Sequence, residues 1–230
     1  AGCRSPAAAT DLHALAETSS GRLEVAQLDV GDQASVEAFA ASVAEKHQRC
    51  DMLLNVAGIL HDEAHPAAPE RALKSVDREW FSKTLEVNTV GPLMLAQALE
   101  PLLRSTGRGA AKTASGETRP PSVVANLSAR VGSIGDNGMG GWYSYRISKA
   151  ALNMATKNMS LELKRSGVWC VTLHPGTTDT GLSKPFQKNV KPEKLFTTKF
   201  TVSQLLGVVE SMDVSHTGSF FAWDGQEIEW

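Results

Sequence analysis

Short apolar runs alternate with longer amphipathic stretches along this chain. The runs at 52–57 (MLLNVA), 122–127 (SVVANL) and 168–173 (VWCVTL) carry no charge and have the length of buried strands. Residues 23–30 alternate between apolar and polar positions, and 219–223 form a last apolar run, so both are also predicted to be strands. Because helical stretches separate these strands, the pattern predicts βαβ units and a largely parallel sheet.

The stretches between the strands have helical spacing. Asp32 precedes apolar residues that recur at the spacing of one helix face, so it is predicted to cap a helix. Gly167 is suited to end another helix in a left-handed conformation. The predicted helices after that of Asp32 span 77–104, with an interruption at Gly91-Pro92, then 143–166 and 202–212.

Two segments are predicted to be loops. Residues 105–121 are small, polar and rich in glycine and proline, which indicates a surface excursion from a single domain spanning 1–230. Residues 177–200 directly follow a strand. Ligands of parallel sheets bind beyond the carboxyl ends of strands, so this loop is a candidate lid; its alternative is a solvated connection.

Composition narrows the function. The chain has 230 residues and a net charge of −2, which argues against binding to nucleic acid. No stretch approaches the roughly 20 apolar residues of a membrane span. Cys3, Cys50 and Cys170 have no metal-ligand spacing, so no metal site is expected. Unpaired thiols favour a cytoplasmic protein, with an organelle stroma as the alternative.

Tyr145 and Lys149 are the sharpest candidate for chemistry. They are four residues apart in a predicted helix and therefore share one face. An ammonium near a phenol favours the phenolate, so the pKa of Tyr145 is expected below the value of about 10 in model peptides. Such a phenol can exchange a proton with a carbonyl or alcohol oxygen. Taken alone, the pair is a weak signal, because Tyr and Lys four residues apart are more often a solvent-facing stripe of a helix.

Polar or glycine-bearing residues also follow three predicted strands. They are Asn55 to Gly58, Asn126 to Ser128, and His174 to Gly176. The carboxyl ends of parallel strands meet at one edge of the sheet, where a ligand would lie. Each segment alone could be an ordinary strand exit, but their coincidence with Tyr145 and Lys149 favours a site.

Asn88 has a further property that depends on Pro92. Proline has no N–H, so the carbonyl of Asn88 loses its helical donor four residues later, and Gly91 eases the resulting kink. We expect the freed carbonyl to hold an ordered water that serves a proton relay through Lys149 to Tyr145.

These residues together resemble the short-chain dehydrogenase/reductase family. NVAG at 55–58, Asn88, the Tyr145 and Lys149 pair, and Pro175-Gly176 with Thr180 occur in the family's order and approximate spacing, and the likeness runs through nearly the whole chain. Further segments are similar to the sniffer-like or C-factor-like carbonyl reductases: LSARVGSIGDN (127–137), SYRISKAALN (144–153), LHPGTTDT (173–180) and FFAWDGQEIEW (220–230).

The resemblance implies a Rossmann-like, doubly wound parallel sheet that binds a nicotinamide dinucleotide. It implies hydride transfer between this cofactor and a small aldehyde, ketone or alcohol. Tyr145 would be the general acid/base, Lys149 would bind the nicotinamide ribose, and Asn88 would hold the relay water. The remaining cofactor contacts that it implies are Asp29, Val30, Asn55, Ala57, Gly58, Pro175, Gly176 and Thr180.

Arg4 bears on the choice of cofactor. By the resemblance it follows the family's second strand, where a guanidinium pairs well with a ribose 2′-phosphate. NADP is therefore expected, with NAD as the alternative. Members of the family often associate through the helices that correspond to 77–104 and 143–166, which suggests a homodimer or homotetramer; the alternative is that these apolar helix faces only cover the sheet.

One departure from the family concerns the catalytic serine. The family usually places it second in a Ser-Ser pair that ends a strand, whereas Ser128 is here followed by Ala129. Ser128 is favoured because it lies at the end of a strand, as the family's serine does. Ser133 is favoured because its separation from Tyr145 in the sequence is close to the one usual in the family. Both remain candidates, with Ser128 slightly preferred.

The other departure concerns the cofactor phosphates. The family's glycine-rich TGxxxGxG turn occurs nowhere in the 230 residues. The alignment places the start of the chain near the end of the family's second strand, so the first strand and first helix are expected to be missing. The alternative function is a non-catalytic fragment or interaction module with this fold. A Rossmann-like methyltransferase would leave Tyr145, Lys149 and Asn88 unexplained.

Overall fold

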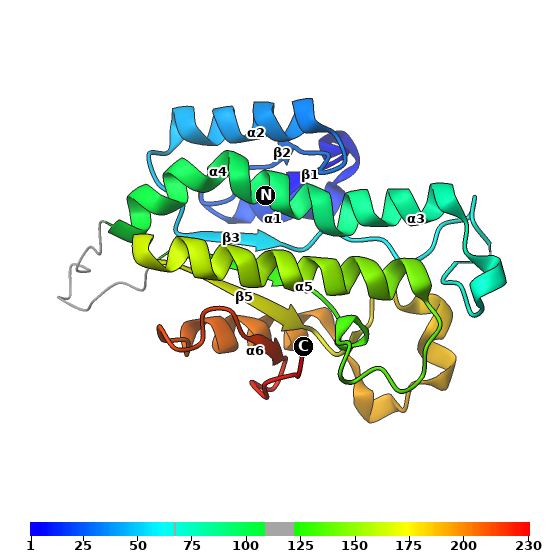
Figure 1. Ribbon diagram of the computed structural model, residues 1–230. Helices are drawn as coiled ribbons and strands as arrows, with labels where there is room; N and C mark the ends of the chain where they lie inside the picture. Colours follow the sequence, from blue (N-terminus) through cyan, green and yellow to red (C-terminus); the bar gives the residue numbers. More distant parts are fainter. Residues whose placement is uncertain (67, 109–121) are drawn as a thin grey trace.

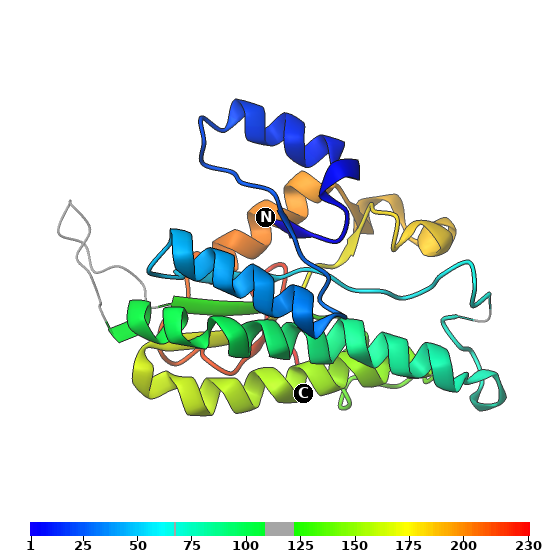
Figure 2. The same ribbon diagram turned by 90° about the horizontal axis from the view of Figure 1, so that it is seen from above.

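A parallel sheet lies between two layers of helices in the computed structural model, which describes residues 1–66, 68–108 and 122–230. Helices α2 (Gln33–Lys46), α4 (Gly91–Arg108) and α5 (Tyr143–Leu163) cover one face (Figure 1). Helices α1 (Thr10–Thr18) and α6 (Thr198–Glu210) lie on the other side (Figure 2). This arrangement confirms the predicted α/β fold.

The main sheet contains β3 (Met52–Asn55), β4 (Ser122–Leu127), β5 (Val168–His174) and β8 (Phe220–Ala222), in that order and all parallel. All four strands were predicted. Their register aligns the ends, because Asn55 lies beside Asn126 in the pairing of β3 with β4. The polar strand ends identified in the sequence therefore meet at one edge of this sheet.

A smaller sheet pairs β1 (Gly2–Cys3) with β2 (Ala26–Gln27), also in parallel. The strand predicted at 23–30 is thus much shorter, because its partner offers only two residues. No described strand pairs between β1 and β3, and the two sheets are connected instead through α2. Near this gap Met52, Leu54 and Val56 are 38%, 45% and 63% exposed, so one face of β3 is uncovered.

The helices begin and end close to the predicted positions. Asp32 accepts a hydrogen bond from Ala34 N at 3.0 Å and caps α2 as expected. The predicted helix 77–104 is three pieces: α3 (Arg78–Leu85), a π-helical turn (Glu86–Val90) and α4. Helix α6 begins earlier than predicted because Thr197 caps it through Phe200 N. Helix α1 was not predicted, since it buries no residue.

Both predicted loops differ in part from the expectation. Residues 105–108 continue helix α4, and 109–121 lie outside the described residues. The segment 177–200 is folded rather than irregular. It contains the parallel pair β6 (Thr177–Thr178) and β7 (Leu195–Phe196), 3₁₀ turns at Lys184–Asn189 and Pro192–Lys194, and the first turn of α6.

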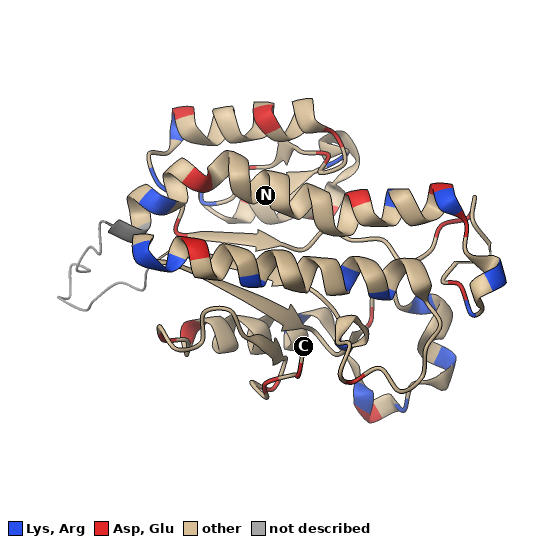
Figure 3. Cartoon of the chain, viewed as in Figure 1, with Lys and Arg blue, Asp and Glu red and all other residues tan. Residues whose placement is uncertain are grey.

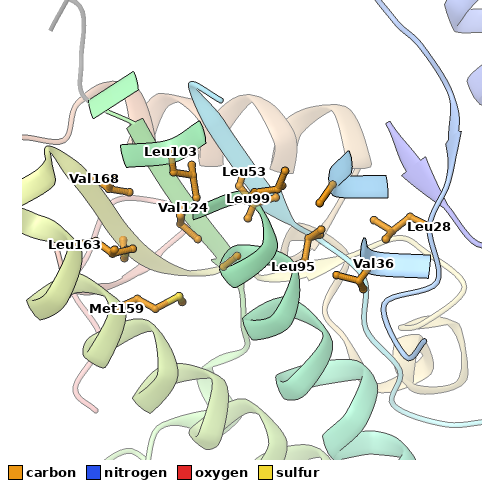
Figure 4. Packing of buried hydrophobic residues seen from close by; sticks show 13 residues of the cluster. Leu28, Val36, Leu53, Leu95, Leu99, Leu103, Val124, Met159, Leu163 and Val168 are labelled. Carbon is orange, nitrogen blue, oxygen red and sulfur yellow. The ribbon is translucent and has the colours of Figure 1, made fainter. Parts of the chain in front are cut away.

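The largest core cluster fills the space between the sheet and helices α2, α4 and α5. Figure 4 shows its side chains, which include Leu28, Val36, Leu53, Leu95, Leu99, Leu103, Val124, Met159, Leu163 and Val168. A second cluster packs β4 and β5 against α6. Charged residues of both signs are spread over the helices and loops, and the strands carry almost none (Figure 3). Across the described residues, the helices lack the length and apolarity that a bilayer crossing needs.

Candidate active site

A cavity of about 790 Å³ opens at the carboxyl ends of β3, β4 and β5. Helix α6 and the segment 177–190 form its other walls. Nine of the residues selected from the sequence line it: Asn55, Ala57, Gly58, Ser128, Tyr145, Lys149, Pro175, Gly176 and Thr180. The structure thus brings together at one cavity segments that are far apart in the sequence, as the parallel topology predicts.

Tyr145 and Lys149 lie in the first two turns of α5 and are both buried. Lys149 Nζ donates a hydrogen bond to Leu127 O at 2.8 Å, at the end of β4. The same ammonium lies 5.7 Å from the ring centroid of Tyr145. The predicted shared face is confirmed, and it faces the cavity rather than solvent.

Burial sets the protonation of this pair. It raises the pKa of Tyr145 and lowers the pKa of Lys149 to about 8. Removal from water disfavours the charged form of each group. The expectation that the pKa of Tyr145 is lowered is therefore wrong for this protein, because burial of the phenol disfavours its charged form. At neutral pH Tyr145 is a protonated phenol and can donate its proton.

Asn88 lies behind the cavity wall in the π-helical turn and is fully buried. Its Oδ1 accepts from Ile59 N at 2.8 Å, and its Nδ2 donates to Ile59 O at 2.9 Å and to Ser148 Oγ at 3.0 Å. A Cβ at Gly58 would lie 3.3 Å from Asn88 Oδ1 and 3.4 Å from Lys149 Nζ. Asn88 therefore fixes the loop after β3 beside Lys149, and glycine permits this close approach.

The two candidate serines have different surroundings. Ser128 lines the cavity, and its Oγ donates to Asn153 Oδ1 at 2.8 Å. Ser133 is also buried, but its Oγ accepts from Asp136 N at 3.0 Å and it does not line the cavity. Ala129 lines the cavity at the position where the family's serine was expected. Geometry thus favours Ser128, whose hydroxyl must leave Asn153 to reach a ligand.

A ladder of buried side chains aligns the strand ends with α5. Asn55 Nδ2 donates to Asn126 Oδ1 at 2.8 Å, and Asn126 Nδ2 donates to Thr156 Oγ1 at 2.8 Å. Thr156 Oγ1 in turn donates to Leu152 O. The strand-end asparagines were visible in the sequence, but Thr156 lies on a helix face that sequence spacing did not connect to them.

Aromatic side chains form an outer wall that the sequence indicated only in part. The Trp142 ring lies 6.3 Å from that of Tyr145 and 5.1 Å from that of Phe186, between ring centroids. His61 lies 6.0 Å from Phe186, and its Nε2 is 3.1 Å from Leu182 O. The segment 177–200 thereby contributes Leu182 and Phe186 to the outer wall of the cavity.

His174 ends β5 and also lines the cavity. Its Nδ1 is buried and has no hydrogen-bond partner among the described residues. Burial, followed by the charge of Arg130, lowers the pKa of His174 to about 4. The imidazole is therefore neutral at physiological pH. Within the described ranges, no three His, Cys, Asp or Glu side chains gather as a metal site would require.

Arg4, Asp29 and Val30 lie apart from the cavity, around the small sheet. Arg4 is exposed, and its carbonyl accepts from Gln27 Nε2. Asp29 Oδ1 accepts from Gly31 N at 3.0 Å. None of the three lines the cavity. The structure thus does not join these residues to the nine predicted residues, Tyr145 among them, that line the cavity.

Comparisons with known proteins agree with this geometry. The family model described as short chain dehydrogenase matches residues 3–191. A 1-hydroxy-2-glutathionyl-2-methyl-3-butene dehydrogenase of Rhodococcus sp. (strain AD45) is 34% identical over 207 residues, which are 88% of this chain and 78% of that protein.

Two solved structures cover the whole chain. The NADPH-bound carbonyl reductase from chicken fatty liver has a TM-score of 0.85 at 30% identity, with 86% of that chain covered. The carbonyl reductase Sniffer of D. melanogaster has a TM-score of 0.84 at 27% identity, again with 86% covered. The likeness to sniffer-like carbonyl reductases expected from the motifs is confirmed. This chain belongs to the short chain dehydrogenase family of oxidoreductases.

Proposed function

We propose that this protein reduces an aldehyde or ketone to an alcohol, with NADPH as the hydride donor and Tyr145 as the proton donor. The observation that carries the proposal is the buried Tyr145 phenol at a cavity shared with Lys149. Burial raises the pKa of Tyr145, so the phenol is protonated at neutral pH. A protonated phenol is the form that a carbonyl reduction requires.

The residues around Tyr145 fit the nicotinamide half of such a cofactor. Lys149 presents a buried ammonium, and Gly58 leaves space that a Cβ would fill. Lys149 would bind the ribose hydroxyls, while Asn55, Ala57 and Gly58 would line the cleft that holds the cofactor. Pro175, Gly176 and Thr180 would hold the nicotinamide end. The cofactor, when bound, supplies the hydride that is added to the carbonyl carbon.

The chain's own residues would manage the proton. Tyr145 donates its hydroxyl proton to the substrate oxygen as negative charge develops there. Ser128 rotates away from Asn153 Oδ1 and donates a hydrogen bond to the same oxygen. Asn88 holds a water beside Lys149, through which Tyr145 regains its proton. A bound cofactor and substrate would displace water from the largely apolar walls of this cavity.

NADP is proposed over NAD on two grounds. Arg4 presents an exposed guanidinium beside the small sheet, where it can pair with a 2′-phosphate, and Asp29 with Val30 would contact the adenine. The similar carbonyl reductase from chicken fatty liver is described as NADPH-bound. A titration of NADPH and NADH, followed by protein fluorescence, tests the preference: NADPH should bind more tightly, and Arg4→Ala should abolish the difference.

A second candidate function is a non-catalytic module with the same fold. Two observations favour it: the 230 residues contain no glycine-rich turn for the pyrophosphate, and no described strand joins β1 to β3. The decisive experiment is NADPH oxidation with a panel of aldehydes and ketones. Turnover that is lost in Tyr145→Phe supports the reductase. Absence of both NADPH binding and turnover supports the module.

A further inference from the structure

Glu70 is a buried carboxylate that the catalytic proposal does not use. It is 1% exposed, and it forms no salt bridge with the described residues. Its Oε2 accepts from Ser144 N at 3.2 Å, its Oε1 accepts from Ser144 Oγ, and its backbone oxygen accepts from Trp142 N. All three donors belong to the start of α5. The carboxyl group of Glu70 therefore lies at the N-terminus of α5, where free N–H groups need acceptors.

Helix α5 lacks a cap of its own. Trp142 occupies the N-cap position, and its side chain makes no capping hydrogen bond. Serine, threonine, aspartate or asparagine normally supply that bond. Glu70, which lies far away in sequence on the loop after β3, takes over this role by accepting from Ser144 N.

The backbone before α5 needs such a restraint. Gly140 and Gly141 have φ values of 64° and 66°, and Trp142 follows with a φ of 52°. Glycine adopts this left-handed conformation freely, but a large aromatic residue does so only where its surroundings hold it. The hydrogen bond from Trp142 N to the Glu70 carbonyl oxygen supplies one of the restraints.

This turn determines two features of the active site at once. The Trp142 ring forms the outer wall, 5.1 Å from Phe186 between centroids. Tyr145, the proposed proton donor, follows Ser144 directly in the same turn. A change in the hydrogen bonds at Trp142 and Ser144 therefore moves both the indole and the phenol.

We infer that Glu70 is a positioning residue of this active site. It holds the first turn of α5 in the orientation in which Trp142 and Tyr145 both face the cavity. The inference rests on the proposed carbonyl reduction for its kinetic consequences, but its structural part does not. Glu70 acts through Trp142 and Ser144 and makes no contact with the substrate.

The variants Glu70→Ala, Glu70→Gln and Glu63→Ala test this role. Glu70→Ala removes both side-chain acceptors of Ser144 and keeps the backbone acceptor of Trp142 N. It should lower kcat at least tenfold, because a small misplacement of a reacting group is costly. Its KM should rise more for a bulky aromatic ketone than for a small aldehyde, since Trp142 forms the wall. Glu70→Gln keeps an acceptor for Ser144 N and should restore most of kcat. Glu63 is an exposed carboxylate on the same loop, so Glu63→Ala is the matched control.

A second measurement is independent of activity. The indole N–H resonance of Trp142, assigned by its loss in Trp142→Phe, reports the position of this ring in ¹⁵N-labelled protein. It should shift in Glu70→Ala and in Ser144→Ala, and remain in place in Glu63→Ala. In kinetics, Glu70→Ala and Ser144→Ala should be non-additive, because they break the same hydrogen bond.

The outcomes separate the two proposals. A lower Tm for Glu70→Ala, with kcat and the Trp142 resonance at wild-type values, would show a role in stability alone and overturn the inference. If none of the tested aldehydes and ketones supports NADPH oxidation by the wild-type protein, the proposed function fails. The shift of the Trp142 resonance in Glu70→Ala and Ser144→Ala, and its unchanged position in Glu63→Ala, then still decide whether Glu70 positions the turn.

Discussion

The ammonium of Lys149 donates a hydrogen bond to the Leu127 carbonyl oxygen at 2.8 Å, which joins the second turn of α5 to the end of β4. Buried charges need such partners, and this carbonyl is the protein acceptor that Lys149 has in the described residues. The remaining two N–H groups of the ammonium are available to a ligand. The contact fixes Lys149 at the cavity and beside Tyr145.

Removal of the Tyr145 hydroxyl should abolish catalysis without disturbing binding. Tyr145→Phe keeps the buried ring but has no proton to donate, so we expect kcat to fall by about 10²–10⁴-fold. NADPH affinity, measured by fluorescence titration, should change less than threefold. Tyr143→Phe, in the same turn, is the control and should retain activity. An active Tyr145→Phe protein would exclude this residue as the acid.

Activity should depend on the charge of Lys149. Because burial lowers the pKa of Lys149 to about 8, the ammonium is present below this pH and is lost above it. We therefore expect kcat/KM to fall as pH rises through about 8, measured at saturating NADPH. Lys149→Met should lower kcat/KM at pH 7 and abolish its decrease above about pH 8. If the decrease persists unchanged in Lys149→Met, it is due to the titration of another group.

The two serines can be separated by single substitutions. Ser128→Ala should lower kcat/KM by about 10²-fold or more, if its hydroxyl stabilises charge on the substrate oxygen. Ser133→Ala should leave kcat/KM near the wild-type value, because Ser133 Oγ is turned toward Asp136 N. The reverse result would identify Ser133 as the catalytic serine, and equal losses would exclude a distinct role for Ser128.

His174 should make the fold sensitive to acid. Its pKa is lowered from 6.5 to about 4 by burial, so the unfolded chain binds a proton at pH values where the folded protein does not. Stability is thus expected to be complete above pH 6.5 and to fall as pH drops toward 4, by about 3 kcal/mol in total. Urea unfolding at several pH values measures this. His174→Gln should reduce the slope, whereas His47→Gln, at an exposed position, should leave it unchanged.

The ladder of amides should be important for stability. Asn126→Ala removes the acceptor of Asn55 Nδ2 and the donor to Thr156 Oγ1, both of which are buried. Unsatisfied buried groups of this kind cost about 1–3 kcal/mol each. We expect the free energy of unfolding to fall by about 2–4 kcal/mol in urea titrations. Asn158→Ala, on the exposed side of α5, should change it by less than about 0.5 kcal/mol.

The strands of the main sheet and the elements that carry the site are predictable from the amino-acid pattern alone. β4 was predicted without error at 122–127, because a short, uncharged run rich in β-branched residues is typical of a strand that is buried in a sheet. The four-residue spacing of Tyr145 and Lys149 fixed their shared face, since it depends only on helix geometry. Strand-end position likewise placed Asn55, Gly58, Ser128 and Gly176 at one edge.

Tertiary structure decided the properties that depend on distant neighbours. The pKa of Tyr145 is raised rather than lowered, because the surrounding chain removes water from the phenol. Ser128 and Ser133 differ through Asn153 and Asp136, which no local pattern connects to them. Glu70 caps a helix that begins more than seventy positions later. Local periodicity reports which face of an element is apolar, whereas desolvation and long-range hydrogen bonds exist only once the elements pack.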